Sequence, residues 1–121
     1  MKYIPINFQK KYSKINEQWS PKVIAKMNDY QFKIAKIEGE FIWHKHDETD
    51  EVFIIVEGSM KIEFRDGSVN LKQGEMFVVP KGIEHKPIAS KECKIINIEP
   101  SGTSNTGDTK SNRTVNGNDW I

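Results

Sequence analysis

Short apolar runs separated by turn residues fill the chain between Lys22 and Glu99. The runs are rich in Val, Ile and Phe, and a turn such as Asn28-Asp29, Asp66-Gly67 or Pro80-Lys81-Gly82 interrupts them roughly every eight to twelve positions. This spacing is typical of an all-β sandwich or barrel. Because no long helical segment separates the runs, parallel βαβ units are excluded and the strands are expected to pair antiparallel.

The runs differ in how apolar residues are spaced along them. The run at 51–56 is apolar on both faces, which predicts a central strand, whereas 60–65 alternates apolar and charged residues and so has one wet face. The predicted strands are 22–27, 30–38, 41–46, 51–56, 60–65, 69–71, 76–79 and 95–98.

The segment at 1–20 is rich in Lys and is predicted to hold one short helix. Asn7 is a suitable N-cap residue. The residues that follow it at helical spacing are Phe8, Lys11, Tyr12 and Ile15. We expect this segment to pack on a barrel domain formed by residues 21–100.

Residues 101–121 form a polar tail of Ser, Thr, Asn, Gly and Asp that cannot fold alone. The tail is expected either to be disordered or to lie over another surface. Our hypothesis is that it packs along the barrel or a partner subunit, with Trp120 and Ile121 as its apolar anchor. A frayed end is the alternative.

Charge and cysteine content limit the partners and the compartment. The chain has 18 basic and 17 acidic residues, so no broad charged surface predicts binding to nucleic acid or to a membrane. Cys93 is the only cysteine, which excludes an intrachain disulfide. Since no apolar run has the length of a signal peptide or a membrane span, we expect a cytoplasmic protein. Cys93 is predicted to be a buried, inert thiol because no base is recognisable beside it.

The three histidines lie at predicted strand edges and carry the candidate chemistry. His44 and His46 are two positions apart, so on a strand both side chains point to the same face. Glu51 begins the next strand and returns beside His46, and closure of a barrel would bring His85 to the same point. Three imidazoles and one carboxylate suit Mn, Fe, Co, Ni or Zn and leave open positions for water or substrate.

Each of these residues also has a simpler interpretation. An H-x-H pair arises often by chance, Glu51 could be an exposed charge at a strand start, and His85 could be a polar loop residue. Their joint occurrence at these spacings favours the metal site. Carboxylates that could orient the histidines, or could simply be solvated loop charges, are Glu48, Asp50 and Glu84.

Two motifs make the sequence resemble the cupin superfamily. The residues that match the first motif, G-x5-H-x-H-x3 or 4-E-x6-G, are Gly39, His44, His46, Glu51 and Gly58, with the first glycine displaced by one position. The residues that match the second motif, G-x5-P-x-G-x2-H-x3-N, are Gly74, Pro80, Gly82 and His85, while Ala89 stands where the family has Asn. Both motifs occur in the family's order.

The resemblance is closest to small single-domain cupin type-2 proteins of bacteria. It implies an antiparallel jelly-roll β-barrel, commonly a homodimer. It also implies a single divalent metal ion (Mn, Fe, Ni, Co or Zn) held by His44, His46, Glu51 and His85.

The resemblance leaves the reaction open, because cupins run oxygenation, isomerisation, decarboxylation and ligand sensing on the same four ligands. Our leading hypothesis is a metal-dependent enzyme of the dioxygenase or isomerase type that acts on a small organic substrate. The alternative is a non-catalytic module that binds a small ligand or a metal. A vestigial metal site is disfavoured by the four intact ligands. No catalytic residue can be named from the sequence.

Overall fold

The backbone of this computed structural model, which describes residues 1–121, consists mainly of antiparallel strands. The elements are α1 (Phe8–Tyr12), β1 (Lys22–Met27), β2 (Tyr30–Glu40), β3 (Glu51–Glu57), β4 (Ser59–Phe64), β5 (Gly67–Lys72), β6 (Met76–Val79) and β7 (His85–Pro100). Every strand pairing is antiparallel, which confirms the predicted fold class. No helix here has the length and apolar character needed to cross a membrane.

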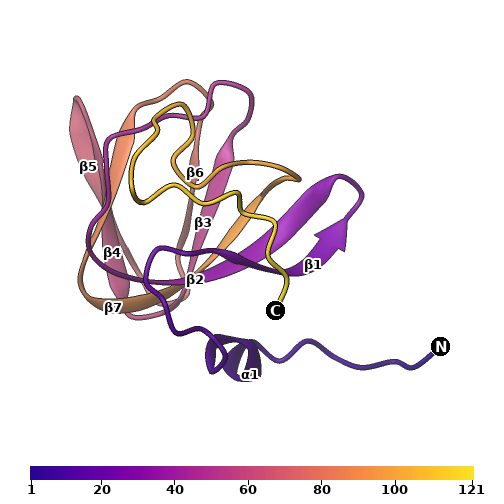
Figure 1. Cartoon of the computed structure of the whole chain (residues 1–121). Helices are drawn as coiled ribbons and strands as arrows, with labels where there is room; N and C mark the ends of the chain where they lie inside the picture. Colours follow the sequence, from indigo (N-terminus) through magenta and orange to yellow (C-terminus); the bar gives the residue numbers. More distant parts are fainter.

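Strand β7 organises the barrel. It is 16 residues long and pairs with three other strands. Its first residues pair with β4, and its later residues lie between β2 and β3. The sheet therefore runs in the order β1-β2-β7-β3-β6, with β4 and β5 attached through β7, and curls round on itself into the predicted jelly-roll barrel (Figure 1).

The predicted strand at 41–46 is wrong. Only His44 forms a bridge there, to His85. The next backbone groups bond to loops instead: Lys45 N donates to Asp108 Oδ1 at 3.0 Å, and His46 O accepts from Gly82 N at 2.8 Å. Because loops take these later hydrogen bonds, the segment bonds to β7 only at Phe41 and His44 and forms no continuous strand.

The strand predicted at 95–98 is too short, since β7 begins at His85. The first half of β7 has no continuous apolar run, because it contains Pro87 and the exposed polar residues from Ser90 to Glu92. These residues pair at the β4 side of the barrel or lie where the strand passes from one partner to the next. The strand's length comes from its three partners and not from its own composition.

The two faces of the main sheet carry separate apolar clusters. Phe53 and Ile55 of β3 point into the barrel interior, whereas Ile54 and Val56 pack in a second cluster on the outer face. Strand β3 lies between β7 and β6, so the predicted central strand is confirmed. The interior cluster is Ala35, Ile37, Phe53, Ile55, Met60, Ile62, Leu71, Val79, Ala89, Cys93 and Ile95.

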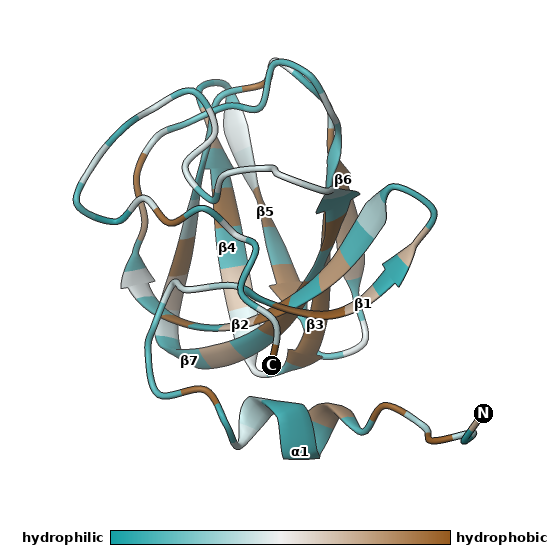
Figure 2. Cartoon of the chain, turned by 45° about the vertical axis from the view of Figure 1, so that its right-hand side comes forward, coloured by the Kyte–Doolittle hydropathy of each residue, from teal (hydrophilic) through white to brown (hydrophobic).

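Helix α1 covers the outer cluster, as Figure 2 shows below the sheet. Asn7 caps it as predicted, because its side chain accepts a hydrogen bond from Lys10 N at 2.9 Å. Tyr12 is buried, and its hydroxyl donates to the carbonyl of Ile95 on β7. This contact fastens the N-terminal segment to the strand that organises the barrel.

The residues before α1 form an extended arm that leaves the body of the molecule (Figures 1 and 2). Its large apolar side chains are exposed: Tyr3 by 86% and Ile4 by 75%. Ile6 is also exposed. The arm therefore has no apolar contact within its own chain that would bury these groups.

The polar tail lies along the barrel, which is one of the two arrangements expected from the sequence. Thr106 is fully buried, and Asp108 N donates to the carbonyl of Lys45 at 3.0 Å. At the end of the chain, Ile121 packs on the outer cluster and its N–H bonds to the carbonyl of Val23. The predicted anchor is thus half right, because Trp120 stays 58% exposed.

Replacing Gly107 by Ala is expected to detach the tail from the segment that carries His46. A Cβ at Gly107 would overlap the carbonyl oxygen of Lys45, and φ there is 55°. Gly102→Ala is the matched control, since Gly102 also has positive φ but open space around it. Thermal unfolding should show that Gly107→Ala lowers the free energy of unfolding by more than the ~1–2 kcal/mol expected from left-handed backbone alone. Protease cleavage after Pro100 should also be faster in Gly107→Ala than in the control. Equal losses in the two variants would contradict the packing.

Candidate metal centre

Four buried side chains from three parts of the chain converge at one end of the barrel. His44 and His46 come from the crossing segment, Glu51 begins β3 and His85 begins β7. One ligand atom of each residue lies within 4.8 Å of the others. The structure thus brings together all four residues that the sequence analysis selected. Their role as metal ligands stays a prediction.

Backbone pairing holds two of the rings. The bridge between His44 and His85 uses both backbone hydrogen bonds, His44 N to His85 O at 3.1 Å and His85 N to His44 O at 2.9 Å. The imidazole centroids of these residues are 4.3 Å apart. A narrow antiparallel bridge therefore places the two rings side by side at the barrel mouth.

Carbonyl groups fix which ring nitrogen faces the centre. His44 Nδ1 lies 2.9 Å from Ile42 O, and His85 Nδ1 lies 2.9 Å from Ile83 O. A carbonyl only accepts hydrogen bonds, so Nδ1 donates in both rings and Nε2 is the nitrogen that faces the cluster. Metal-binding histidines are usually oriented in this way.

Glu51 lies among these nitrogens. Its Oε1 is 3.2 Å from His85 Nε2, and its Oε2 is 3.4 Å from His46 Nε2. His46 Nε2 is buried and has no hydrogen-bond partner, although Glu51 Oε2 lies 3.4 Å away. An unpartnered buried nitrogen aimed at a carboxylate is costly unless something binds between them. The donor set could hold a divalent transition metal.

Burial and the neighbouring charges set the ionisation of the cluster. Burial, followed by the charge of His85, lowers the pKa of His44 to about 4, so this imidazole is neutral near pH 7. Burial opposes ionisation of Glu51, but its contacts with His46 and His85 hold its pKa well below the usual range. Burial also acts to lower the pKa of His46, yet the contact with Glu51 raises it on balance. An ionised carboxylate among imidazoles forms a site that a cation would neutralise.

Of the three acidic residues considered as orienting groups, two contact other partners and the third is exposed. Asp50 Oδ1 accepts from Lys81 N at 2.8 Å, and Glu84 pairs with Arg65. Glu48 is exposed. The interpretation of these residues as solvated loop charges therefore fits, and backbone carbonyls orient His44 and His85 instead.

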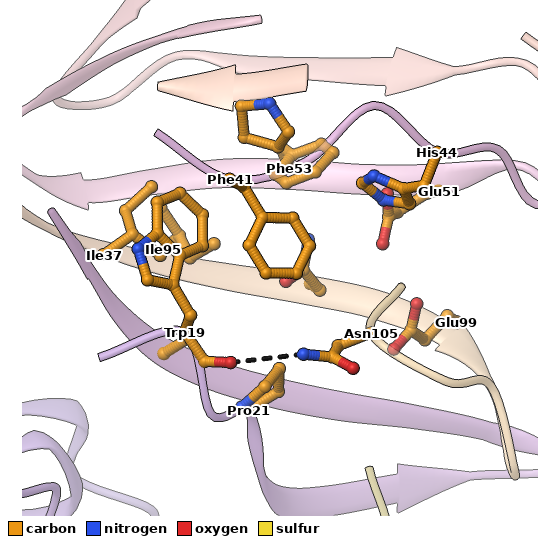
Figure 3. Close-up of a pocket in the computed structure, with 13 residues that line it drawn as sticks. Trp19, Pro21, Ile37, Phe41, His44, Glu51, Phe53, Ile95, Glu99 and Asn105 are labelled. Atoms are coloured by element: carbon orange, nitrogen blue, oxygen red, sulfur yellow. Dashed lines mark hydrogen bonds between the residues drawn. The ribbon is translucent and has the colours of Figure 1, made fainter. Parts of the chain in front are cut away.

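A small cavity lies beside the cluster, inside the barrel (Figure 3). Trp19 and Phe41 stack at one side of it with ring centroids 4.7 Å apart. His44 and Glu51 lie at the other side, together with Glu99. The cavity has a volume of about 40 Å³, room for a few water-sized groups. It therefore has an apolar side and a polar side that borders the candidate ligands.

The sequence analysis missed the polar residues of this cavity. Asn97 and Glu99 lie two and four positions after Ile95 on β7, and the side chain of Ile95 points into the barrel. Because side chains alternate along a strand, this spacing alone predicts that Glu99 also points inward. Asn105 reaches the cavity from the tail. No local pattern in the tail could have revealed that contact.

Comparison with known proteins identifies the fold family. The Cupin domain family matches residues 31–99, more than half of the chain. The solved structure of a cupin-2 domain containing protein from Shewanella frigidimarina NCIMB 400 is 62% identical, covers 78% of this chain and 93% of that one, and has a TM-score of 0.78.

Two curated relatives also align. The uncharacterized protein YdbB of Bacillus subtilis (strain 168) is 33% identical over 75 residues, 61% of this chain and 66% of YdbB. The 3-hydroxyanthranilate 3,4-dioxygenase of Xenopus tropicalis is 31% identical over 91 residues, 69% of this chain and 32% of the enzyme. The chain thus spans just under two thirds of YdbB and about one third of the dioxygenase. With its barrel strands matched by the family, this chain belongs to the cupins, as a small cupin of the bacterial type.

Proposed function

We propose that this cupin is a metal-dependent enzyme that acts on a small organic substrate and holds one divalent ion on His44, His46, Glu51 and His85. The observation that carries the proposal is the convergence of three imidazoles and a carboxylate around the unpartnered Nε2 of His46. A protein ligand set of four leaves open positions on a five- or six-coordinate ion.

A bound ion would supply Lewis acidity or a place for dioxygen. The chain's own residues do the rest. The carbonyls of Ile42 and Ile83 orient two imidazoles, and the stacked rings of Trp19 and Phe41 form the apolar side of the cavity. A substrate that reaches the ligands from this cavity would meet a dry, shaped wall.

Within this proposal, a dioxygenase or an isomerase reaction is our preferred class. The similarity to 3-hydroxyanthranilate 3,4-dioxygenase supports oxygen chemistry, although it spans only 32% of that enzyme. The non-catalytic alternative, a module that binds a small ligand or a metal, is favoured by the small volume of the cavity, about 40 Å³. Metal identity separates these: iron would favour oxygen chemistry, whereas zinc or manganese would leave isomerase, decarboxylase and binding roles open.

Alanine variants test the metal site. Replacing His44, His46 or His85 by Ala removes a ligand and is expected to abolish stoichiometric metal in protein purified without chelator, as measured by elemental analysis. Lys45→Ala is the matched control, because Lys45 lies between two of the ligands and points its half-exposed side chain toward Asp47. Full metal retention in all three histidine variants would rule out the site.

We also propose a homodimer, supported by the exposed apolar arm before α1. Light scattering should give about twice the 14.0 kDa of one chain. Replacing Tyr3, Ile4 and Ile6 by Ser should lower the mass to that of one chain, whereas Lys2→Ala should not. A monomeric mass for the unaltered protein would refute the dimer.

A cytoplasmic location remains a prediction, based on the single cysteine, which is buried and unpaired.

A further inference from the structure

The carboxyl group of Glu99 is buried at the polar side of the cavity and is only half satisfied. Glu99 is only 3% exposed. Oε1 pairs with Lys33 Nζ at 2.9 Å, and the same ammonium donates to Thr103 O at 3.1 Å. Oε2 has no hydrogen-bond partner. Buried polar atoms without a partner are rare and costly, so Oε2 is open to a polar partner that enters the cavity.

Strand pairing places Glu99 next to the candidate metal ligands. Strands β3 and β7 pair with Phe53 opposite Asn97 and Val52 opposite Ile98, so the interior position after Asn97 falls beside Glu51. Glu99 lines the same cavity as His44 and Glu51, and Figure 3 shows its carboxyl group on their side of the pocket. A molecule that reaches the metal ligands through this cavity passes Glu99.

The neighbouring amides of the cavity already have partners. Asn97 Nδ2 donates to Val52 O at 2.9 Å, and Asn105 Nδ2 donates to Trp19 O at 3.3 Å (Figure 3). Asn105 Oδ1 accepts from Val115 N at 2.8 Å. Among the residues that line the cavity, Glu99 alone has a buried side-chain oxygen left free.

The chemistry of the carboxyl group limits what can satisfy it. Burial, and then the negative charge of Glu51, raise the pKa of Glu99 to about 8. The free oxygen accepts a hydrogen bond when the carboxyl group is ionised and can donate one when it is protonated. A ligand hydroxyl both donates and accepts, so it pairs with either form, whereas a ketone only accepts and an ammonium only donates.

The size of the cavity limits the ligand further. Its volume of about 40 Å³ is well below the ~150 Å³ of an engineered cavity that binds benzene. A ring would require a wall to move. A compact ligand with a few carbon atoms fits better, and a carboxylate on it would suit the cation at the proposed metal site.

We propose that Glu99 is a ligand-binding residue whose free oxygen Oε2 contacts the hydroxyl group of a compact, hydroxyl-bearing organic acid bound at the metal centre. The inference rests on the proposed function for the metal end of this ligand. It deepens that function by naming compact, hydroxyl-bearing organic acids as the substrate class.

A cycle of two probes and two proteins tests this contact. Glycolate is acetate with one hydroxyl group added, so the two probes isolate the contribution of the hydroxyl. Their binding is measured on Co²⁺-loaded protein by calorimetry and by the visible absorption of the ion. The unaltered protein should prefer glycolate by about tenfold or more, the effect of one hydrogen bond to an ionisable group. Glu99→Gln keeps a polar group of the same shape but replaces a charge-assisted hydrogen bond by a weaker neutral one, so it should reduce this preference to about twofold and leave acetate binding unchanged.

Two further variants control for folding and for charge. Glu57→Gln removes a surface partner of Lys94, 2.8 Å away, and should keep the preference of the unaltered protein. Glu99→Asp keeps the charge opposite Lys33 but withdraws the oxygen, so it should lose most of the preference even if Glu99→Gln folds poorly.

The outcomes separate this inference from the metal site. A glycolate preference that is equal in the unaltered protein and in a folded Glu99 variant would overturn it, as would no preference in the unaltered protein. Cobalt content is measured on the same samples. If the unaltered protein takes up no cobalt, the proposed function fails, and the same cycle on metal-free protein then decides whether Glu99 binds the hydroxyl.

Discussion

The burial of the Glu51 carboxylate is the constraint on which the rest of this site depends. A charge in the interior is tolerated only where opposite charge or hydrogen-bond donors surround it. His46 and His85 lie within 3.4 Å of its two oxygens, and their own positions come from the crossing segment and from the start of β7. Three distant stretches of chain must therefore meet for one side chain to be stable. A cation shared by Glu51 and the imidazoles is the simplest group that satisfies them all.

The barrel supplies this meeting point because its interior is divided. Apolar side chains fill most of it, while Lys33, Glu51, Asn97 and Glu99 line the end beside the histidines. Strand β7 links the two regions, since His85 and Glu99 near its two ends lie at the polar end and Ala89, Cys93 and Ile95 between them lie in the apolar cluster. The tail then closes the polar end: Gly107 lies against the backbone of Lys45, and Asn105 reaches the cavity. The polar composition of the tail, which prevents independent folding, suits it to cover a polar opening.

The features predicted correctly from the sequence are those that depend on the spacing of residues a few positions apart. Strand periodicity and turn residues were enough for the all-β antiparallel class, and the cap at Asn7 was enough for α1. The convergence of the four candidate ligands was predicted from spacing together with the cupin motifs, although the strand assumed to carry His44 and His46 did not form. The error at 41–46 arose because loops, which composition does not reveal, took the backbone hydrogen bonds. Trp120 and Asn105 show the same limit, since what covers or contacts them is set by residues far along the chain. Glu99 was within reach, as strand alternation turns it inward with Ile95.

The measurement that tests the central claim most directly is anomalous X-ray diffraction from crystals of protein purified without chelator, recorded at the absorption edges of Mn, Fe, Co, Ni and Zn. The account predicts one anomalous peak between the imidazoles of His44, His46 and His85 and the carboxylate of Glu51, at bonding distances of about 2.0–2.2 Å for a metal such as zinc. The edge that gives the peak would identify the metal. No peak at this position, even after the crystals are soaked in each of these metals, would contradict the metal centre and leave a buried cluster of charges without a function.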